Sequence, residues 1–246
     1  GDVESLWLTS KGFWQTETEV ELLPEAIKQI AKTKGINLPP LVAIAGPVKA
    51  SECASAKPTA TVFACRDYEL AKRYAKTVTT PNYSVTPSQD EIGVEVCAAL
   101  KNIYAIALGI ADGMSAADEQ PRDNLRAAIF VQAVAEMASL CHALGGDLQT
   151  AYGLAGMGDL QLTSTAGRSR LYGHAVGAGQ NPRQALEQMQ SQGLTIEGSP
   201  AALIAHQLVQ QLGLNAPLLE AVYQMLHGHV DDARALICAV ALGVDA

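Results

Sequence analysis

The residues best placed to do chemistry are a lysine and an asparagine that stand side by side in a long apolar run. The run covers residues 90–114, and the pair is Lys101 and Asn102. On a helix, which turns by about 100° per residue, an apolar stripe from Ile92 to Ile110 faces the core. Lys101 then lies nearly opposite this stripe, and Asn102 lies on its edge. A lysine in an apolar setting can act as an acid or a base. The alternative is that Lys101 extends into water, as many helix lysines do.

A second group of residues suited to chemistry lies between residues 153 and 179. Glycines there bring the backbone close to a neighbour, Asp159 follows them, and residues 163–165 supply three hydroxyls. Gly167-Arg168-Ser169 then begins a predicted helix. Free backbone N–H groups at a helix start, together with an arginine and a serine, form a good anion site. The alternative is an ordinary glycine- and serine-rich loop with a solvated arginine.

The composition narrows the class of protein. Of the 246 residues, 48% are apolar, so a large core is expected. The net charge of −8 argues against a nucleic-acid partner, although a local basic pocket for a phosphate stays possible. The five cysteines are scattered and form no CxxC pair. Such usage is typical of reduced thiols, and we expect a cytoplasmic protein.

Neither a metal site nor a membrane span is expected. The five histidines form no HExxH motif, and His227 and His229 flank a glycine in what we expect to be a solvated turn. Residues 92–111 are apolar enough to suggest a membrane helix. Glu95 and Lys101 inside that run would make a membrane position costly.

The order of elements indicates an α/β layer followed by helices. Strands are predicted at 5–10, 41–45, 59–65 and 83–86, and helices between them at 24–35 and 67–78. From residue 90 onward only helices are predicted, at 90–113, 122–144, 147–157, 168–178, 182–191, 199–213, 216–227 and 231–243. Strands alternating with helices are typical of an α/β sheet. The boundary between the two parts is predicted at residues 88 and 89.

Several motifs together carry a resemblance to a known family. They are GVEVCAALKNIYAIALGIADGM at 93–114, Asn124 within DNLRAA, and GLAGMGDLQLTSTAGRSR at 153–170. SKG at 10–12, AGPVKASE at 45–52 and TIEGSPAA at 195–202 fit the same pattern in the same order. This sequence resembles the NAD(P)-dependent glycerol-3-phosphate dehydrogenases over nearly its whole length.

The resemblance implies a fold and an activity. Residues 1–88 would be the C-terminal part of a Rossmann-type dinucleotide-binding domain. Residues 89–246 would be an all-helical substrate and catalytic domain similar to the C-terminal domain of 6-phosphogluconate dehydrogenase. The implied reaction interconverts dihydroxyacetone phosphate and sn-glycerol 3-phosphate with NAD or NADP. A homodimer is expected from the apolar helical domain.

The resemblance also implies roles for individual residues. Lys101 would be the acid and base at the C2 oxygen, and Lys11 would lie beside substrate and cofactor. Asn102, Asp159 and Thr163 would order the lysine and the substrate hydroxyls. The implied substrate contacts are Lys11, Gly46, Val48, Thr163, Gly167, Arg168 and Ser169. The implied cofactor contacts are Lys11, Ala50, Arg168 and Glu197.

The sequence departs from the family pattern in three places. No GxGxxG motif opens a βαβ unit, so we expect a piece of a longer enzyme that binds phosphate but neither binds NADH nor turns over alone. Ser169 stands where the family usually has asparagine, and Val48-Lys49 replaces a more usual small-polar and aromatic pair. Two alternatives therefore stay open. One is a related dehydrogenase for another phosphorylated or acidic ketone, and the other is a non-catalytic helical dimerisation or binding module.

Overall fold

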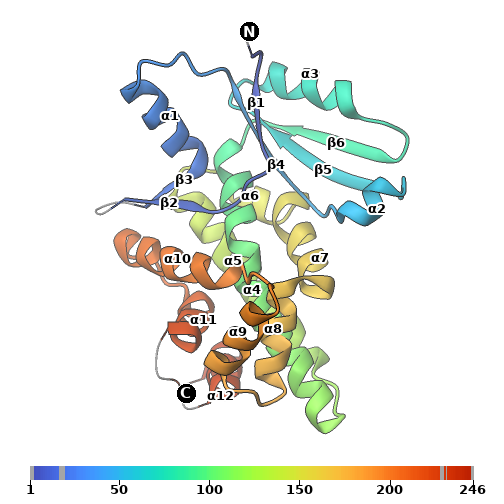
Figure 1. Ribbon diagram of the computed structural model, residues 1–246, viewed down its shortest axis with the longest axis vertical. Helices are drawn as coiled ribbons and strands as arrows, with labels where there is room; N and C mark the ends of the chain where they lie inside the picture. Colours follow the sequence, from blue (N-terminus) through green and yellow to red (C-terminus); the bar gives the residue numbers. More distant parts are fainter. Residues whose placement is uncertain (1–2, 17–19, 228–229, 231, 245–246) are drawn as a thin grey trace. The chain divides into compact units, whose positions relative to one another are not determined.

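The chain forms two compact units, and each unit is built from two separate segments. The computed structural model describes residues 3–16, 20–227, 230 and 232–244 (Figure 1). The first unit contains Gly1–Ala99 and Met137–Asp159, and the second contains Leu100–Glu136 and Leu160–Ala246. The long helices α4 (Glu91–Asp118) and α5 (Asp123–Ala143) therefore contribute residues to both units. The division predicted at residues 88 and 89 stays a prediction.

A four-stranded sheet organises the first unit, as the strand pattern predicted. Its order is β1 (Leu6–Leu8), β4 (Leu41–Ala45), β5 (Thr59–Ala64), β6 (Tyr83–Ser88). Strands β1 and β4 run parallel, as do β5 and β6, whereas β4 and β5 are antiparallel with Ala43 opposite Ala64. The antiparallel pair is joined through the short helix α2 (Ala50–Ala54), because antiparallel neighbours need no long crossover.

Helix α3 (Tyr68–Val78) covers this sheet with an apolar face. Tyr74 on the helix packs with Val42 and Phe63 of the sheet in one buried cluster. The Asp67 side chain accepts hydrogen bonds from the N–H groups of Glu69 and Leu70 at 3.0 and 3.2 Å, which fixes where the helix begins. The predicted helix at 67–78 is confirmed.

A hairpin that the sequence did not predict follows β1. It pairs β2 (Phe13–Gln15) with β3 (Val20–Leu22), and α1 (Leu23–Thr33) follows directly. Each strand has three residues, which is too short for an alternating pattern to be recognised. Phe13 and Leu22 are its buried partners, while Trp14 is exposed.

Helix α4 is buried on nearly all sides, so the prediction of one core-facing stripe was too narrow. Val94, Leu100 and Leu108 are as fully buried as Ile106 on the predicted stripe. The side chain of Lys101 is only 6% exposed, and the interpretation that it extends into water is wrong. Among the described residues α4 alone has the length and hydropathy of a membrane span, and 94% of the relevant window is buried within the protein.

Glycines allow α4 to lie very close to α8 (Arg168–Gly177) in the second unit. A Cβ added at Gly173 would overlap the carbonyl oxygen of Ile106, and one added at Gly177 would overlap that of Ile110. On the facing side, a Cβ at Gly109 would overlap the carbonyl oxygen of Arg170. The side of α4 that carries Gly109 is therefore covered by a neighbouring helix.

Two carboxylates, the buried Glu136 and the partly buried Asp112, hold the helices of the second unit together. Glu136 on α5 accepts hydrogen bonds from the N–H groups of Leu218 and Leu219 at 2.7 and 3.0 Å. These groups lie at the start of α11 (Pro217–His227), where N–H groups lack partners within the helix. Burial raises the pKa of Glu136, and the hydrogen bonds oppose that rise. Asp112 on α4 accepts from Arg126 at 3.1 Å and from Arg170 at 2.9 Å.

The remaining elements mostly match the predicted helices. They are α6 (Leu148–Ala151), the π-helical turn η1 (Leu154–Gly158), α7 (Asp159–Ala166), α9 (Pro182–Ser191), α10 (Gly198–Leu212) and α12 (Ala233–Leu242). The glycine- and hydroxyl-rich stretch that sequence treated as a loop is instead helix α7. Within this helix the Ser164 and Thr165 hydroxyls donate to the carbonyls of Gln161 and Leu162 at 2.9 and 2.7 Å, so both hydroxyls have partners without a loop.

Candidate functional site

In the second unit, the carboxylate of one predicted site residue binds the side chains of two others. Glu197, at the N-cap position of α10, accepts a hydrogen bond from the Asn102 side-chain amide on Oε2 at 2.9 Å. Its other oxygen, Oε1, accepts from the Arg168 guanidinium at 2.9 Å. The Arg168 and Glu197 side chains are 48% and 53% exposed, so this ion pair is weak and can open to a ligand. Arg168 and Glu197 lie 66 and 95 positions after Asn102 in the chain, and the structure brings the three side chains together.

Close packing at the start of α10 places Glu197 beside α4. A Cβ added at Gly198 would lie 2.5 Å from the carbonyl oxygen of Asn102, so only glycine fits there. The Gly198 N–H donates to the Ser169 hydroxyl at 3.4 Å, and Ser169 is buried. The Ser169 oxygen therefore serves the start of α10, and its predicted role in substrate binding stays a prediction.

Helix α8 begins at Arg168, as predicted, with Gly167 at its N-cap. A Cβ on Gly167 would lie 2.6 Å from the Thr163 carbonyl oxygen, which accepts the Gly167 N–H at 3.0 Å. This contact ties the end of α7 to the start of α8. The first N–H groups of α8 have no partner within the helix and can bind an anion together with Arg168.

Two buried charged residues lie next to these elements along the chain. Lys101, with 6% exposure, precedes Asn102 on α4 in the second unit. Asp159, with 2% exposure, begins α7 and belongs to the first unit. Burying a charge is costly unless it is paired, so a buried lysine and a buried aspartate are both candidates for a functional role.

In the first unit, the strand ends carry the other predicted residues. Gly46 follows β4 with a φ of 148°, and an added Cβ would lie 2.9 Å from the Thr61 Cα, so the turn requires glycine. Val48 and Ala50 follow on an exposed segment that leads into α2. Pro47 lies 3.6 Å from the Cβ position of Gly158, which brings the segment after β4 against η1. Lys11 is exposed just after β1.

Sequence reasoning missed a buried acid in the first unit. Glu95 is 1% exposed on α4, and its Oε2 has no hydrogen-bond partner among the described residues. Burial raises the pKa of Glu95 to about 8; the nearby Glu91 adds to the rise, and the Lys11 cation opposes it. Two acids one helical turn apart in an apolar run could have indicated this from sequence.

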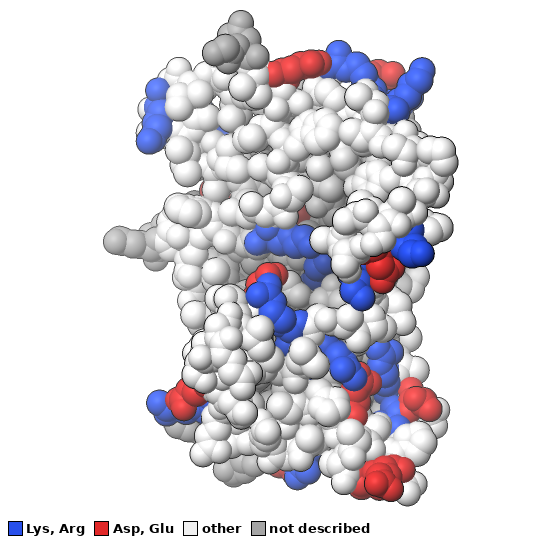
Figure 2. Space-filling view, turned by 45° about the vertical axis from the view of Figure 1, so that its right-hand side comes forward, with Lys and Arg blue, Asp and Glu red and all other residues white. Residues whose placement is uncertain are grey.

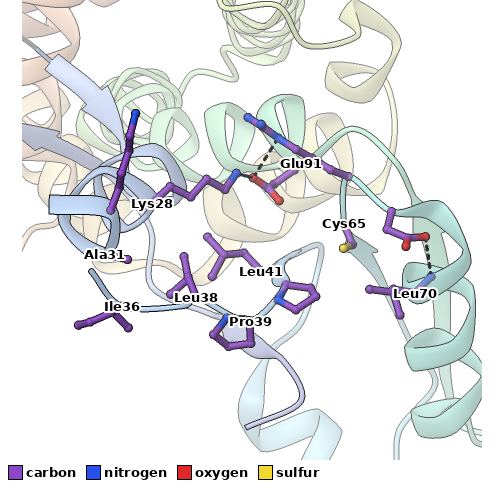
Figure 3. A pocket seen from close by; sticks show the side chains of 13 residues that line it. Lys28, Ala31, Ile36, Leu38, Pro39, Leu41, Cys65, Leu70 and Glu91 are labelled. Carbon is purple, nitrogen blue, oxygen red and sulfur yellow. Dashed lines mark hydrogen bonds and ion pairs between the residues drawn. The ribbon is translucent and has the colours of Figure 1, made fainter. Parts of the chain in front are cut away.

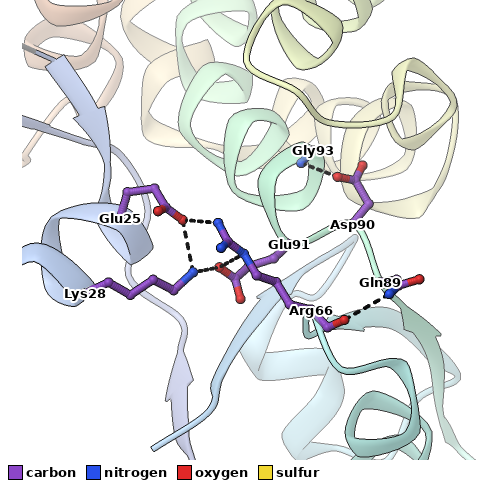
Figure 4. A network of polar contacts seen from close by, with 7 residues as sticks. All are labelled: Glu25, Lys28, Arg66, Gln89, Asp90, Glu91 and Gly93. Atoms are coloured by element: carbon purple, nitrogen blue, oxygen red, sulfur yellow. Dashed lines mark hydrogen bonds and ion pairs between the residues drawn. The ribbon is translucent and has the colours of Figure 1, made fainter. Parts of the chain in front are cut away.

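The second acid, Glu91, belongs to a network of ion pairs. Lys28 of α1 contacts its carboxylate, and the Arg66 Nε lies 3.7 Å from Oε1 (Figure 4). Both cations also reach Glu25, at 3.0 Å from Lys28 and 2.6 Å from Arg66. Figure 4 shows the four charged side chains meeting between α1 and the start of α4. Glu91 therefore has two cationic partners that come from other elements.

A hollow of about 530 Å³ adjoins the same network. Its wall is mainly apolar, with Leu38, Pro39 and Leu41 on one side and Lys28 and Glu91 above them (Figure 3). None of the predicted site residues is among the described residues that line it. We therefore do not place the predicted chemistry in this hollow.

Charged side chains are sparse on the face that Figure 2 draws. Figure 2 shows small clusters in which basic and acidic groups lie together, separated by broad uncharged areas. Within the described part of the chain, no three His, Cys, Asp or Glu residues are grouped so that they could hold a metal ion. His227 ends α11 with its Nε2 3.3 Å from the Ser199 carbonyl oxygen, and His229 lies outside the described residues.

Family models match both parts of the chain. The N-terminal model of the NAD-dependent glycerol-3-phosphate dehydrogenases matches residues 2–71, and the C-terminal model matches residues 90–236. The glycerol-3-phosphate dehydrogenase [NAD(P)+] of Symbiobacterium thermophilum is 41% identical over 189 residues, which are 76% of this chain and 53% of that protein. The NADP(+)-dependent glycerol-3-phosphate dehydrogenase of Archaeoglobus fulgidus is 33% identical, covering 89% of this chain and 65% of that protein.

Solved structures agree with these matches. The crystal structure of a glycerol-3-phosphate dehydrogenase from Coxiella burnetii superposes with a TM-score of 0.75 at 33% identity, covering 87% of this chain and 63% of that one. The yeast glycerol-3-phosphate dehydrogenase gives a TM-score of 0.75 at 23% identity, covering 92% and 66%, and shows a shared fold. The chain thus spans between about half and two thirds of the length of these relatives. The fold class expected from sequence is confirmed.

Proposed function

Because the chain belongs to the NAD-dependent glycerol-3-phosphate dehydrogenase family, we propose that its site serves the interconversion of dihydroxyacetone phosphate and sn-glycerol 3-phosphate. The observation that supports this most is the cluster in which Glu197 holds Asn102 and Arg168 together. It joins an arginine at a helix start to the residue that follows the buried Lys101.

Lys101 is proposed as the acid and base at the C2 oxygen. A protonated amine beside a ketone stabilises the alkoxide that forms during reduction and can then transfer its proton. Burial strengthens this effect, because the field of the charge is less screened away from water. Asn102, held by Glu197, would present a fixed amide beside the amine, and Asp159 and Thr163 would orient the lysine and the hydroxyls.

The phosphate is proposed to bind where α8 begins. Arg168 is half-exposed and held by one exposed carboxylate, so a phosphate dianion can replace or share Glu197 as its partner. Gly167 and Ser169 would add backbone N–H groups at the same helix start. Lys11, Gly46 and Val48 of the first unit are proposed as substrate contacts on the family resemblance alone.

A nicotinamide cofactor, when bound, would supply or accept the hydride. Lys11 and Arg168 offer cations for its phosphates, Glu197 offers a carboxylate for a ribose hydroxyl, and Ala50 lies on the exposed segment after β4. Cations for phosphates and a carboxylate for a ribose hydroxyl are the kinds of group that a dinucleotide requires. NAD or NADP is proposed as the cofactor on the family membership, a homodimer on the apolar helical domain, and a cytoplasmic location on the scattered cysteines.

Calorimetry with matched ligands tests the proposal on this chain. sn-Glycerol 3-phosphate should bind and glycerol should not, because the phosphate contact dominates. Arg168→Ala should weaken binding by about tenfold, the low end for a charge-assisted contact that is partly exposed. Arg183→Ala is the control, because Arg183 is an exposed arginine paired to Glu187 on α9. Equal affinity for the two ligands would contradict the phosphate site.

A further inference from the structure

Glycine contacts fix the direction in which α8 lies on α4. A Cβ added at Gly109 would overlap the carbonyl oxygen of Arg170, and one added at Gly113 would overlap that of His174. These two contacts are four residues apart on each helix, so the helices run in the same direction. The first turn of α8 is therefore the end that lies toward Lys101 along α4.

A carboxylate further along α4 holds this first turn of α8. Asp112 accepts a hydrogen bond from the Nε of Arg170, the third residue of α8, at 2.9 Å. Lys101 precedes Asp112 by 11 residues, which correspond to about 16 Å along a helix and only about 20° around it. Both residues therefore lie on one side of α4, and the helix itself sets the spacing between them.

The same carboxylate is linked to the end of α7. Arg126 of α5 donates through Nε to Asp112 at 3.1 Å, and through Nη2 to the Ser164 hydroxyl at 3.0 Å and carbonyl at 3.4 Å. Ser164 is fully buried and follows Thr163, whose carbonyl oxygen accepts the N–H of Gly167 at the N-cap of α8. Asp112 thus reaches the junction of α7 and α8 from both sides, through one arginine each.

This group of three residues, the Asp112 cluster, is better shielded from water than the ion pair next to it in the chain. The side chains of Asp112, Arg126 and Arg170 are 19%, 24% and 24% exposed, whereas those of Arg168 and Glu197 are 48% and 53% exposed. Ion pairs lose less to solvent screening when they are partly buried. The cluster should therefore keep its geometry while the exposed pair opens to a ligand.

We propose that Asp112 is a positioning residue for the anion site at the start of α8, acting through Arg170 and Arg126. With both arginines paired to it, Arg168 and the free N–H groups of α8 keep one position along α4 relative to Lys101. Without the carboxylate, the junction of α7 and α8 loses this register. The phosphate ester as the natural anion rests on the proposed function, whereas the positioning of the anion site does not.

Titration with inorganic phosphate, followed by NMR of the backbone amides of residues 167–169, tests the positioning. Asp112→Asn should weaken phosphate binding by about fivefold, within the range for residues that act on a site through others. Asp118→Asn is the matched control, because it makes the same change on α4 at a carboxylate paired with Arg122. The control should leave the affinity unchanged. Equal phosphate affinity in wild type and Asp112→Asn, with both folded by circular dichroism, would overturn the proposal.

A double-variant cycle separates positioning from a merely structural role. Arg168→Ala removes the side chain that the Asp112 cluster positions, so adding Asp112→Asn to it should change phosphate affinity by less than about twofold. A fivefold loss in both backgrounds would show two independent effects and would overturn the positioning role. If Asp112→Asn does not fold, Arg170→Lys replaces it in the cycle. This milder change keeps the charge but removes the Nε contact, and it should show the same dependence on Arg168.

Titration with sn-glycerol 3-phosphate distinguishes this inference from the proposed function. Wild type should bind it more tightly than inorganic phosphate, and Asp112→Asn should weaken the binding of both ligands by the same factor. Equal affinity for the two ligands, with the fivefold loss in Asp112→Asn, would support the positioning role and contradict the proposed substrate. Tight binding of sn-glycerol 3-phosphate that Asp112→Asn leaves unchanged would overturn the positioning role alone. Wild type that binds neither ligand would overturn both.

Discussion

Replacing Glu95 by glutamine should reduce the loss of folding stability that the protein shows at alkaline pH. Its pKa is about 8 in the folded chain against an ordinary value of 4.5. The contribution of protonated Glu95 to the free energy of unfolding is therefore fully present below about pH 4.5. It falls as the pH rises and is lost once the pH has passed through about 8. At 1.36 kcal/mol per pH unit, the difference corresponds to about 5 kcal/mol as an upper limit. A glutamine does not titrate, so Glu95→Gln should avoid this loss.

Urea unfolding followed by circular dichroism at pH 5, 7 and 9 measures the effect. Subtracting one protein from the other isolates residue 95, because all other groups titrate in both. The variant should be about as stable as wild type at pH 5 and more stable by several kcal/mol at pH 9. Lys57→Gln serves as a control for an exposed substitution in the same unit. Parallel stability profiles would show that Glu95 titrates normally, and the reasoning from its burial would fail.

Further predictions concern the helices of the second unit. Gly173→Ala should destabilise the protein by about 1–3 kcal/mol, because its Cβ would overlap the carbonyl oxygen of Ile106; thermal unfolding measures this, and an unchanged midpoint would refute the close crossing. Asp112→Asn should cost about 1.5–3 kcal/mol, because both Arg126 and Arg170 lose a charged partner. A loss no larger than that of an exposed Asp→Asn change would contradict this role.

Local patterns predicted much of the fold. Residues close in sequence determine the strands at 41–45 and 59–65 and the helix at 67–78. Their ends carry recognisable boundary residues, such as Asp67 at the N-cap of α3. The start of α8 at Arg168 followed from the preceding glycine. The hairpin β2–β3 was missed because three-residue strands give too little periodicity, and α7 was missed because its Ser and Thr residues resemble a loop.

The site was harder to predict, because it depends on contacts between distant segments. The sequence motifs indicated Asn102, Arg168 and Glu197 as separate site residues. The structure shows in addition that the Glu197 carboxylate accepts hydrogen bonds from both Asn102 and Arg168. Glu95 was visible in the sequence as an acid within an apolar run. Its missing partner could not be predicted, because Lys28 and Arg66 reach Glu91 from elements far away in sequence.

The central claim is that Lys101 acts on the C2 oxygen of a bound ketone, and carbon NMR of dihydroxyacetone phosphate labelled at C2 tests it without need of turnover. A lysine cation beside the oxygen polarises the carbonyl and moves its resonance downfield. We predict this displacement in the ligand bound to wild type and its loss in Lys101→Met, whose side chain keeps the packing of α4. The control Lys34→Met changes an exposed lysine that follows α1 and should retain the displacement. An identical carbonyl resonance in wild type and Lys101→Met, with ligand bound to both, would contradict the claim.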